Sequence, residues 1–65
     1  MSDVGDLGKR IRSARKAAHL TQQDLSDLAG VSERTVRAIE TGTGNPALAA
    51  VAAVVKVLGL RLVAE

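Results

Sequence analysis

The sequence predicts an all-α fold of four short helices that ends in a short C-terminal strand. Apolar residues recur every three to four positions through most of the chain of 65 residues, which is the spacing of one helix face. Residues that start or end helices, among them Gly30, Gly42 and Pro46, separate these periodic segments. The last few residues alternate apolar and polar side chains, which is typical of a strand.

Length and composition limit the class of protein. A chain of 65 residues forms one domain, and a domain of this size buries only about 60% of the surface that its unfolded chain exposes. Because the sequence contains no cysteine, oligomerisation is the expected source of extra stability. It has no run of about 18 apolar residues, and its polar N-terminus is unlike a signal peptide. We therefore expect a soluble, cytoplasmic protein that associates with the nucleoid.

The first helix is expected over residues 5–18, where Leu7, Ile11, Ala14 and Ala18 share one face. The same segment is strongly basic, with Lys9, Arg10, Arg12, Arg15 and Lys16. Such a run is either a solvated helix face or a phosphate-binding surface, and the motif that follows favours phosphate binding.

Two helices joined by a tight turn are expected next, over residues 22–29 and 33–41. Thr21 caps the first of them with Asp24 three positions later, and Gly30 ends it. Ser32 then caps the second, and Gly42 ends that helix. The inward side chains are expected to be Leu25, Leu28, Ala29, Val36 and Ile39.

A fourth helix is expected from Pro46, capped by Asn45, to about Gly59. Its inward stripe is Leu48, Val51, Val54, Val55 and Leu58, while alanines and Val57 occupy most of the other positions. Lys56 alone interrupts this apolar surface. A helix that is apolar nearly all round is buried on more than one side, which points to a partner subunit.

The final segment, Leu60–Val63, is interpreted as a strand. Since the sequence offers no second strand, we expect it to pair with the same strand of a twin subunit about a two-fold axis. The alternative is a frayed continuation of the fourth helix. The predicted dimerisation segment is residues 46–64, with Val54, Val57, Leu60, Arg61, Leu62 and Val63 at the interface.

Residues 21–42 form a unit that places its second helix in the major groove of DNA. The candidates for base contacts are Ser32, Glu33, Arg34, Arg37 and Ala38. Arg34 is the first of them, because a guanidinium donates two hydrogen bonds to guanine O6 and N7. Arg37 contacts either a base or a phosphate. Glu33 either accepts from a cytosine amino group or pairs with Arg37 one turn away.

Phosphate contacts are expected on both sides of this helix. Thr21 and Gln22 lie at the start of the preceding helix, where free N–H groups and the helix dipole favour an anion. Thr41 and Thr43 are the candidates on the other side, unless their hydroxyls serve only the turn.

Arg15 and Glu40 lie near the inward faces of their helices, so we expect them to form a buried ion pair. His19 is the single histidine and has no ligand neighbours at metal-binding spacing. With no cysteine and no paired carboxylates in a recognisable pocket, we expect no metal, no cofactor and no enzymatic activity.

Residues 7–62 resemble the Cro/C1-type, or xenobiotic-response-element type, helix-turn-helix regulators. The resemblance rests on Thr21-Gln22, Leu25, Ala29-Gly30-Val31-Ser32, Thr35-Val36, Ile39-Glu40 and Gly42. It implies a compact lambda-repressor-like bundle of four to five helices, phosphate contacts at Gln22 and Thr41, and the Arg15–Glu40 pair. It also implies base contacts at Ser32, Glu33, Arg34 and Ala38. Ser26 departs from the family, which usually has alanine there.

The C-terminal part is similar to HipB-type antitoxins, in Asn45-Pro46-Ala47-Leu48, the following Ala/Val-rich helix and Leu58-Gly59-Leu60-Arg61-Leu62. This resemblance implies a repressor of its own operon that also binds a HipA-like Ser/Thr kinase toxin. The predicted function is a homodimeric, sequence-specific repressor that binds an inverted repeat in double-stranded DNA. The alternative is a phage- or plasmid-type repressor without a toxin partner.

Overall fold

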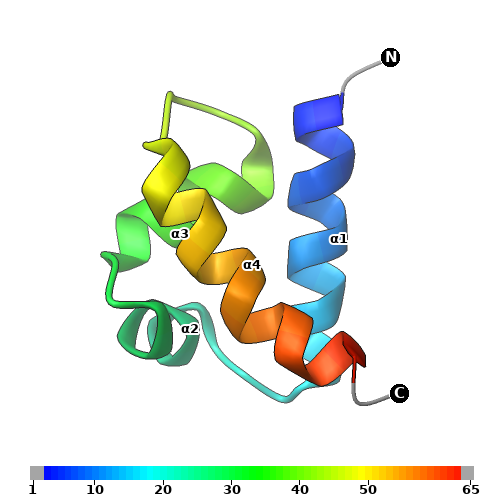
Figure 1. The fold of residues 1–65 in the computed structure, drawn as a ribbon. Coiled ribbons are helices and arrows are strands. Elements are labelled where there is room, and N and C mark those ends of the chain that lie inside the picture. The colour runs from blue at the N-terminus through cyan, green and yellow to red at the C-terminus, as the bar shows by residue number, and fades with distance from the viewer. Residues whose placement is uncertain (1–2, 64–65) are drawn as a thin grey trace.

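The computed structural model describes the backbone of residues 3–63 and the side chains of residues 6–59. Four helices follow in order: α1 (Asp3–Ala17), α2 (Gln22–Ala29), α3 (Glu33–Thr41) and α4 (Leu48–Val63). In Figure 1, α1 stands at one side and α4 runs diagonally across the front. α1 and α2 each pack against both α3 and α4. The all-α prediction is confirmed, although α1 begins two residues earlier and ends one residue earlier than expected.

The starts of α2 and α3 follow from their capping residues. The Thr21 hydroxyl accepts the Asp24 N–H at 2.9 Å, and the Asp24 carboxylate accepts the Thr21 N–H at 3.0 Å. The Ser32 hydroxyl accepts the Thr35 N–H at 3.1 Å. Each cap pairs N–H groups that lack a partner in the first turn of a helix, so both helices begin where the sequence predicts.

The first three helices end in the same way, with a residue in the left-handed conformation. These residues are His19, Gly30 and Gly42, with φ angles of 60°, 71° and 70°. The N–H that follows each of them donates to the carbonyl five residues back: Leu20 to Arg15 at 3.1 Å, Val31 to Ser26 at 3.0 Å, and Thr43 to Ala38 at 3.1 Å. This arrangement pairs the last carbonyls of each helix and turns the chain sharply.

The core lies where the four helices meet. Its buried apolar residues are Ile11, Leu25, Val36, Ile39, Val54 and Leu58. Gly8 lets α1 approach the end of α3 closely, because a β-carbon at this position would lie 2.5 Å from the Ile39 carbonyl oxygen. A side chain at position 8 therefore does not fit without moving α1.

The start of α4 differs from the prediction. The Ala47 carbonyl accepts the N–H groups of Ala50 at 3.0 Å and Val51 at 3.1 Å, so the helix begins at Leu48 rather than Pro46. Residues 43–47 form the loop that connects the end of α3 to the start of α4 (Figure 1).

Three leucine and valine side chains predicted to point inward are exposed. Leu48 is 83% exposed, Leu28 58% and Val55 40%. α4 is covered by the other helices on one side, which buries Val54 and Leu58 and leaves the opposite side uncovered. Val54 is fully buried in the core, so its assignment to a dimer interface was wrong. Val57 is half-buried and packs against the core.

The predicted strand at Leu60–Val63 is also wrong, because these residues continue α4. A single strand leaves its N–H and C=O groups unpaired, whereas a helix pairs them within the segment. Leucine and arginine are also good helix formers. The side chains of Leu60, Arg61, Leu62 and Val63, which were assigned to the dimer interface, lie outside the described residues. Within the described part of the chain, no helix has the length and apolar character required to cross a bilayer.

Candidate nucleic-acid interface

The first turn of α3 presents Ser32 and Arg34 to solvent. Besides capping the helix, the Ser32 hydroxyl donates to the Thr35 hydroxyl at 2.9 Å. Arg34 is exposed, and no described residue forms an ion pair with it. Its guanidinium is therefore available to a ligand without breaking an existing pair.

Arg37 and Glu33 lie one turn apart on the same exposed side of α3. The Arg37 Nη2 atom is 3.8 Å from the Glu33 Oε2 atom, and the two side chains are 61% and 41% exposed. The i,i+4 pair considered from the sequence is thus present, and an exposed pair of this kind is weak. Ala38 is half-buried beside Arg37.

Thr41 and Thr43 are exposed at the end of α3 and bond to each other. The Thr41 hydroxyl donates to the Arg37 carbonyl at 2.9 Å, and the Thr41 and Thr43 hydroxyl oxygens are 2.8 Å apart. These hydroxyls therefore serve the turn in the free protein, while their remaining lone pairs and surface stay open to solvent.

Thr21 and Gln22 lie together at the start of α2. The Thr21 N–H, and secondarily its side chain, hydrogen-bond the Asp24 carboxylate and hold its pKa below the usual value. Gln22 is half-buried, and its amide Nε2 donates to the Glu40 Oε1 atom at 3.3 Å. Gln22 therefore contacts the end of α3 and is also partly exposed to solvent.

Arg15 and Glu40 form the buried ion pair expected from the sequence. Arg15 Nε donates to Glu40 Oε2 at 2.6 Å, and Nη2 donates to Glu40 Oε1 at 3.1 Å. Arg15 Nη1 donates to the Leu20 carbonyl at 2.9 Å. The two side chains are 10% and 2% exposed. This pair connects α1, the turn before α2, and α3.

Comparison with known families identifies this arrangement. The model of a helix-turn-helix family matches residues 11–64, which is most of the chain. The chain belongs to the Cro/C1-type helix-turn-helix family. A comparison with curated proteins gives no match. The family assignment makes the chain a DNA-binding transcription regulator.

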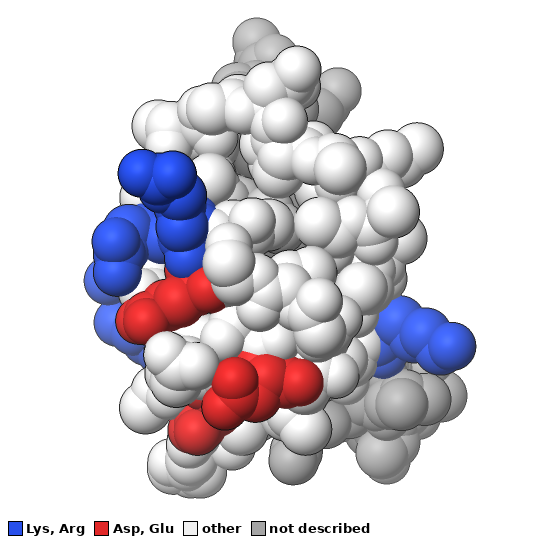
Figure 2. Space-filling model, turned by 90° about the vertical axis from the view of Figure 1, so that its left-hand side faces the viewer, with Lys and Arg blue, Asp and Glu red and all other residues white. Residues whose placement is uncertain are grey.

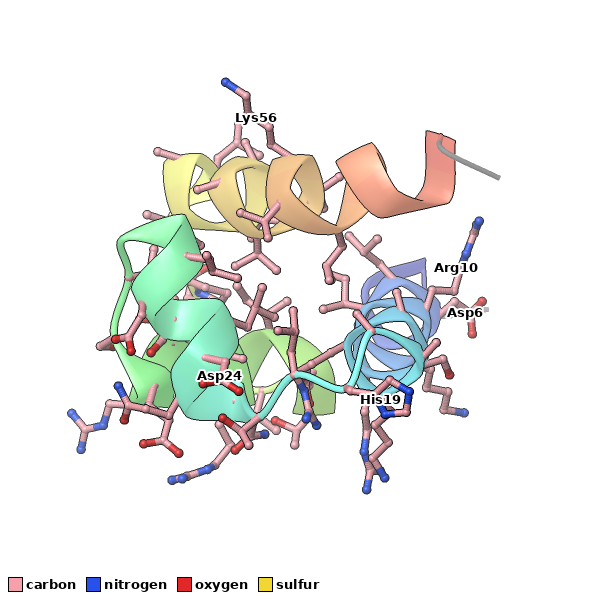
Figure 3. The ribbon with its side chains drawn as sticks, turned by 90° about the horizontal axis from the view of Figure 1, so that it is seen from below. Asp6, Arg10, His19, Asp24 and Lys56 are labelled. Carbon is pink, nitrogen blue, oxygen red and sulfur yellow. The ribbon has the colours of Figure 1, made fainter. Side chains whose placement is uncertain are left out.

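The charges of this helix-turn-helix protein are unevenly distributed. Lys9, Arg10, Arg12 and Lys16 of α1 are exposed, whereas Arg15 is buried and does not belong to the basic surface. Figure 2, which faces the side of α2 and α3, shows several Lys and Arg side chains gathered at one edge with Asp and Glu side chains beside them, and a separate basic side chain at the opposite edge. Figure 3 shows Lys56 projecting from the outer side of α4, away from Asp24 and His19 on the opposite side.

The sequence did not reveal two features of this helix-turn-helix protein. The Gln22–Glu40 hydrogen bond joins residues 18 positions apart, so no local pattern indicates it. Gly8 has no turn or positive φ to mark it, and only its contact with α3 explains the glycine.

Ser26, the departure from the family pattern, is buried and donates to the Gln23 carbonyl at 2.7 Å. Among the described residues, no cluster of His, Asp or Glu could hold a metal ion.

Proposed function

We propose that this protein is a homodimeric repressor that reads an inverted repeat in double-stranded DNA. The observation that carries the proposal is the exposed start of α3, where Arg34 lies without an ion-pair partner among the described residues. Inserted in the major groove, α3 brings Arg34 to guanine O6 and N7. Bound at its operator in the cytoplasm, within the nucleoid, such a dimer blocks access to the promoter.

The neighbouring side chains supply the rest of the proposed interface. Arg37 with Glu33 extends the base-reading surface along α3, and Ser32 and Ala38 border it. Thr21 and Gln22 meet a phosphate at the start of α2, where the helix dipole favours negative charge. Thr41 and Thr43 meet the backbone on the other side. Phosphate contacts orient the domain, and contacts at the base edges select the sequence.

The symmetry of an inverted repeat limits where two subunits meet. Both reading helices must face the same duplex, at half-sites about 10 bp apart. The outer face of α4, formed by Leu48, Ala49, Ala52, Val55 and Lys56, lies on the side of the molecule opposite the first turn of α2 (Figure 3). Pairing through that face directs the two reading helices away from each other. The proposed dimer interface is therefore the C-terminal end of α4, from Val57 to Val63.

The test begins with selection of bound duplexes from a random pool, which should recover an inverted repeat. Arg34→Ala should then remove most of the preference for the selected duplex over a scrambled one, because a bidentate base contact discriminates by roughly 1–3 kcal/mol. Gln22→Ala should weaken binding to both duplexes. Gel shifts at several salt concentrations measure both effects.

The matched control is Lys56→Ala, which makes the same change in charge on the outer side of α4, away from Asp24 at the start of α2 (Figure 3). It should leave discrimination unchanged. If Arg34→Ala weakens binding to both duplexes equally, Arg34 contacts phosphate and the proposed reading is incorrect.

A second candidate function is that of an antitoxin, favoured by the apolar outer face of α4. This face stays uncovered when two subunits bind one operator, and a HipA-like kinase toxin is the partner implied by the C-terminal resemblance. The test is co-purification with the product of the adjacent reading frame. A repressor that binds its operator but captures no such product has no antitoxin role. We assign the chain no catalytic activity in either case.

A further inference from the structure

Glu40 accepts hydrogen bonds from two different helices at once. Arg15 of α1 donates to both carboxylate oxygens, at 2.6 and 3.1 Å, and Gln22 of α2 donates to Oε1 at 3.3 Å. The Glu40 side chain is only 2% exposed, so its contacts are made inside the protein. The ion pair alone does not require the contact from Gln22.

The chemistry of the carboxylate fixes how Gln22 is oriented. A carboxylate accepts hydrogen bonds only, so the Gln22 amide must direct its nitrogen, and not its oxygen, toward Glu40. The amide nitrogen carries two hydrogens, and one of them is donated to Glu40 in a hydrogen bond. The other N–H is left to donate to a phosphate oxygen, which can only accept hydrogen bonds. An amide turned the other way would offer phosphate an oxygen, which repels it.

We propose that Glu40 is a positioning residue for DNA binding: it orients the Gln22 amide so that its second N–H donates to a phosphate. The proposal rests on the proposed operator binding and extends it. Arg15 holds the Glu40 carboxylate in place and also holds the Leu20 carbonyl at 2.9 Å, just before Thr21 and Gln22. These contacts thereby fix the position of the phosphate-binding amide of α2 relative to α3, the helix that reads the bases.

A double-mutant cycle tests this coupling. The apolar replacement Arg15→Met/Glu40→Leu removes the carboxylate without leaving an unpaired buried charge. In the natural protein, Gln22→Ala should reduce operator affinity about tenfold or more, as expected for a hydrogen bond to a charged group. In the Arg15→Met/Glu40→Leu protein, the same substitution should change affinity by less than about twofold. An equal loss in both proteins would overturn the proposal and leave Glu40 a purely structural residue.

Chemically modified DNA provides the specific readout. Replacing single phosphates with neutral methylphosphonates should reveal one position per half-site that weakens binding of the natural protein but not of Gln22→Ala. That position should also have little effect on Arg15→Met/Glu40→Leu. A duplex without any such position shows that Gln22 does not bind phosphate.

A measurement on the natural protein covers the case in which the apolar variant does not fold. In the free protein, one side-chain amide proton of Gln22 should show the downfield shift and slowed exchange of a hydrogen bond to Glu40. Addition of operator DNA should shift the other proton, as followed by NMR. If neither proton shows the downfield shift and slowed exchange of a hydrogen bond in the free protein, or neither shifts with DNA, the proposal fails. Arg34→Ala separates the two hypotheses, because a loss of discrimination there supports operator reading whatever Gln22 does.

Discussion

The carboxyl group of Asp24 shows how one side chain defines the start of a helix. It accepts the Thr21 N–H at 3.0 Å, while the Thr21 hydroxyl accepts the Asp24 N–H at 2.9 Å. This reciprocal pair sets the backbone at the start of α2, where Thr21 and Gln22 lie. The bonds favour the charged carboxylate, so the pKa of Asp24 is lowered in the folded protein.

The stability of the domain should depend on the ionisation of Asp24. Because the folded pKa is lowered, the stabilisation is fully present above the unfolded pKa of about 3.9 and is lost as pH falls through the folded value. Relative to Asp24→Asn, the natural protein should be more stable at neutral pH, and this difference should shrink below about pH 4. Chemical denaturation from pH 7 downward measures it. A stability difference between the two proteins that stays constant with pH would contradict a lowered pKa for Asp24.

At the scale of the elements, close contact between α1 and α3 determines how the helix-turn-helix unit is held. Gly8 brings α1 against the carbonyl groups at the end of α3, and the Arg15–Glu40 pair lies farther along the same helix. His19 ends α1 in a left-handed conformation that glycine adopts more readily, with φ of 60°. The hydrogen bonds that end α1, such as that from the Leu20 N–H to the Arg15 carbonyl, therefore outweigh the cost of holding histidine in the left-handed conformation.

Gly8→Ala should destabilise the domain, although alanine is the better helix former. The new β-carbon would lie 2.5 Å from the Ile39 carbonyl oxygen and 2.8 Å from that of Glu40, and overpacking typically costs about 1–3 kcal/mol. The control is Gly59→Ala in α4, where a β-carbon meets nothing within 4 Å. That substitution should stabilise the helix by up to about 1 kcal/mol. Thermal unfolding should shift in opposite directions for the two variants, and a shift in the same direction would contradict the close packing at Gly8.

The whole molecule combines a small core with an uncovered apolar surface. Six apolar residues are buried among the described side chains, whereas Leu48 and Val55 of α4 remain 83% and 40% exposed. The radius of gyration of 10.6 Å is what a folded chain of this length should have, about 11 Å. The part of the chain that the structure describes is thus compact but buries few apolar side chains, so association with a second copy would add stability.

Removal of residues 60–65 should convert the dimer to monomers, because it deletes the C-terminal end of α4 that we propose as the interface. Leu62→Lys should have the same effect. Leu48→Lys, which changes the outer face of α4, should leave the dimer intact. Analytical ultracentrifugation distinguishes the species. A dimer that survives the deletion but is lost in Leu48→Lys would move the interface to the outer face.

The sequence by itself determined the features that depend on neighbouring residues. Thr21, Ser32, Gly30 and Gly42 set the bounds of α2 and α3, because capping and chain reversal act over three to five residues. The helical spacing of apolar residues also identified most of the core. The Arg15–Glu40 pair followed from two charges near inward faces, since a buried charge requires a partner.

Only the tertiary structure decided which sides of α4 are covered and what its last residues form. The apolar pattern of α4 is nearly uniform, so it does not distinguish Val54, in the core, from Leu48 at the surface. Leu60–Val63 fits a strand or a helix locally, and the helix prevails because it pairs its own backbone groups. The contacts of Gly8 and of Gln22 with α3 join distant parts of the chain, and such contacts leave no local pattern in a sequence.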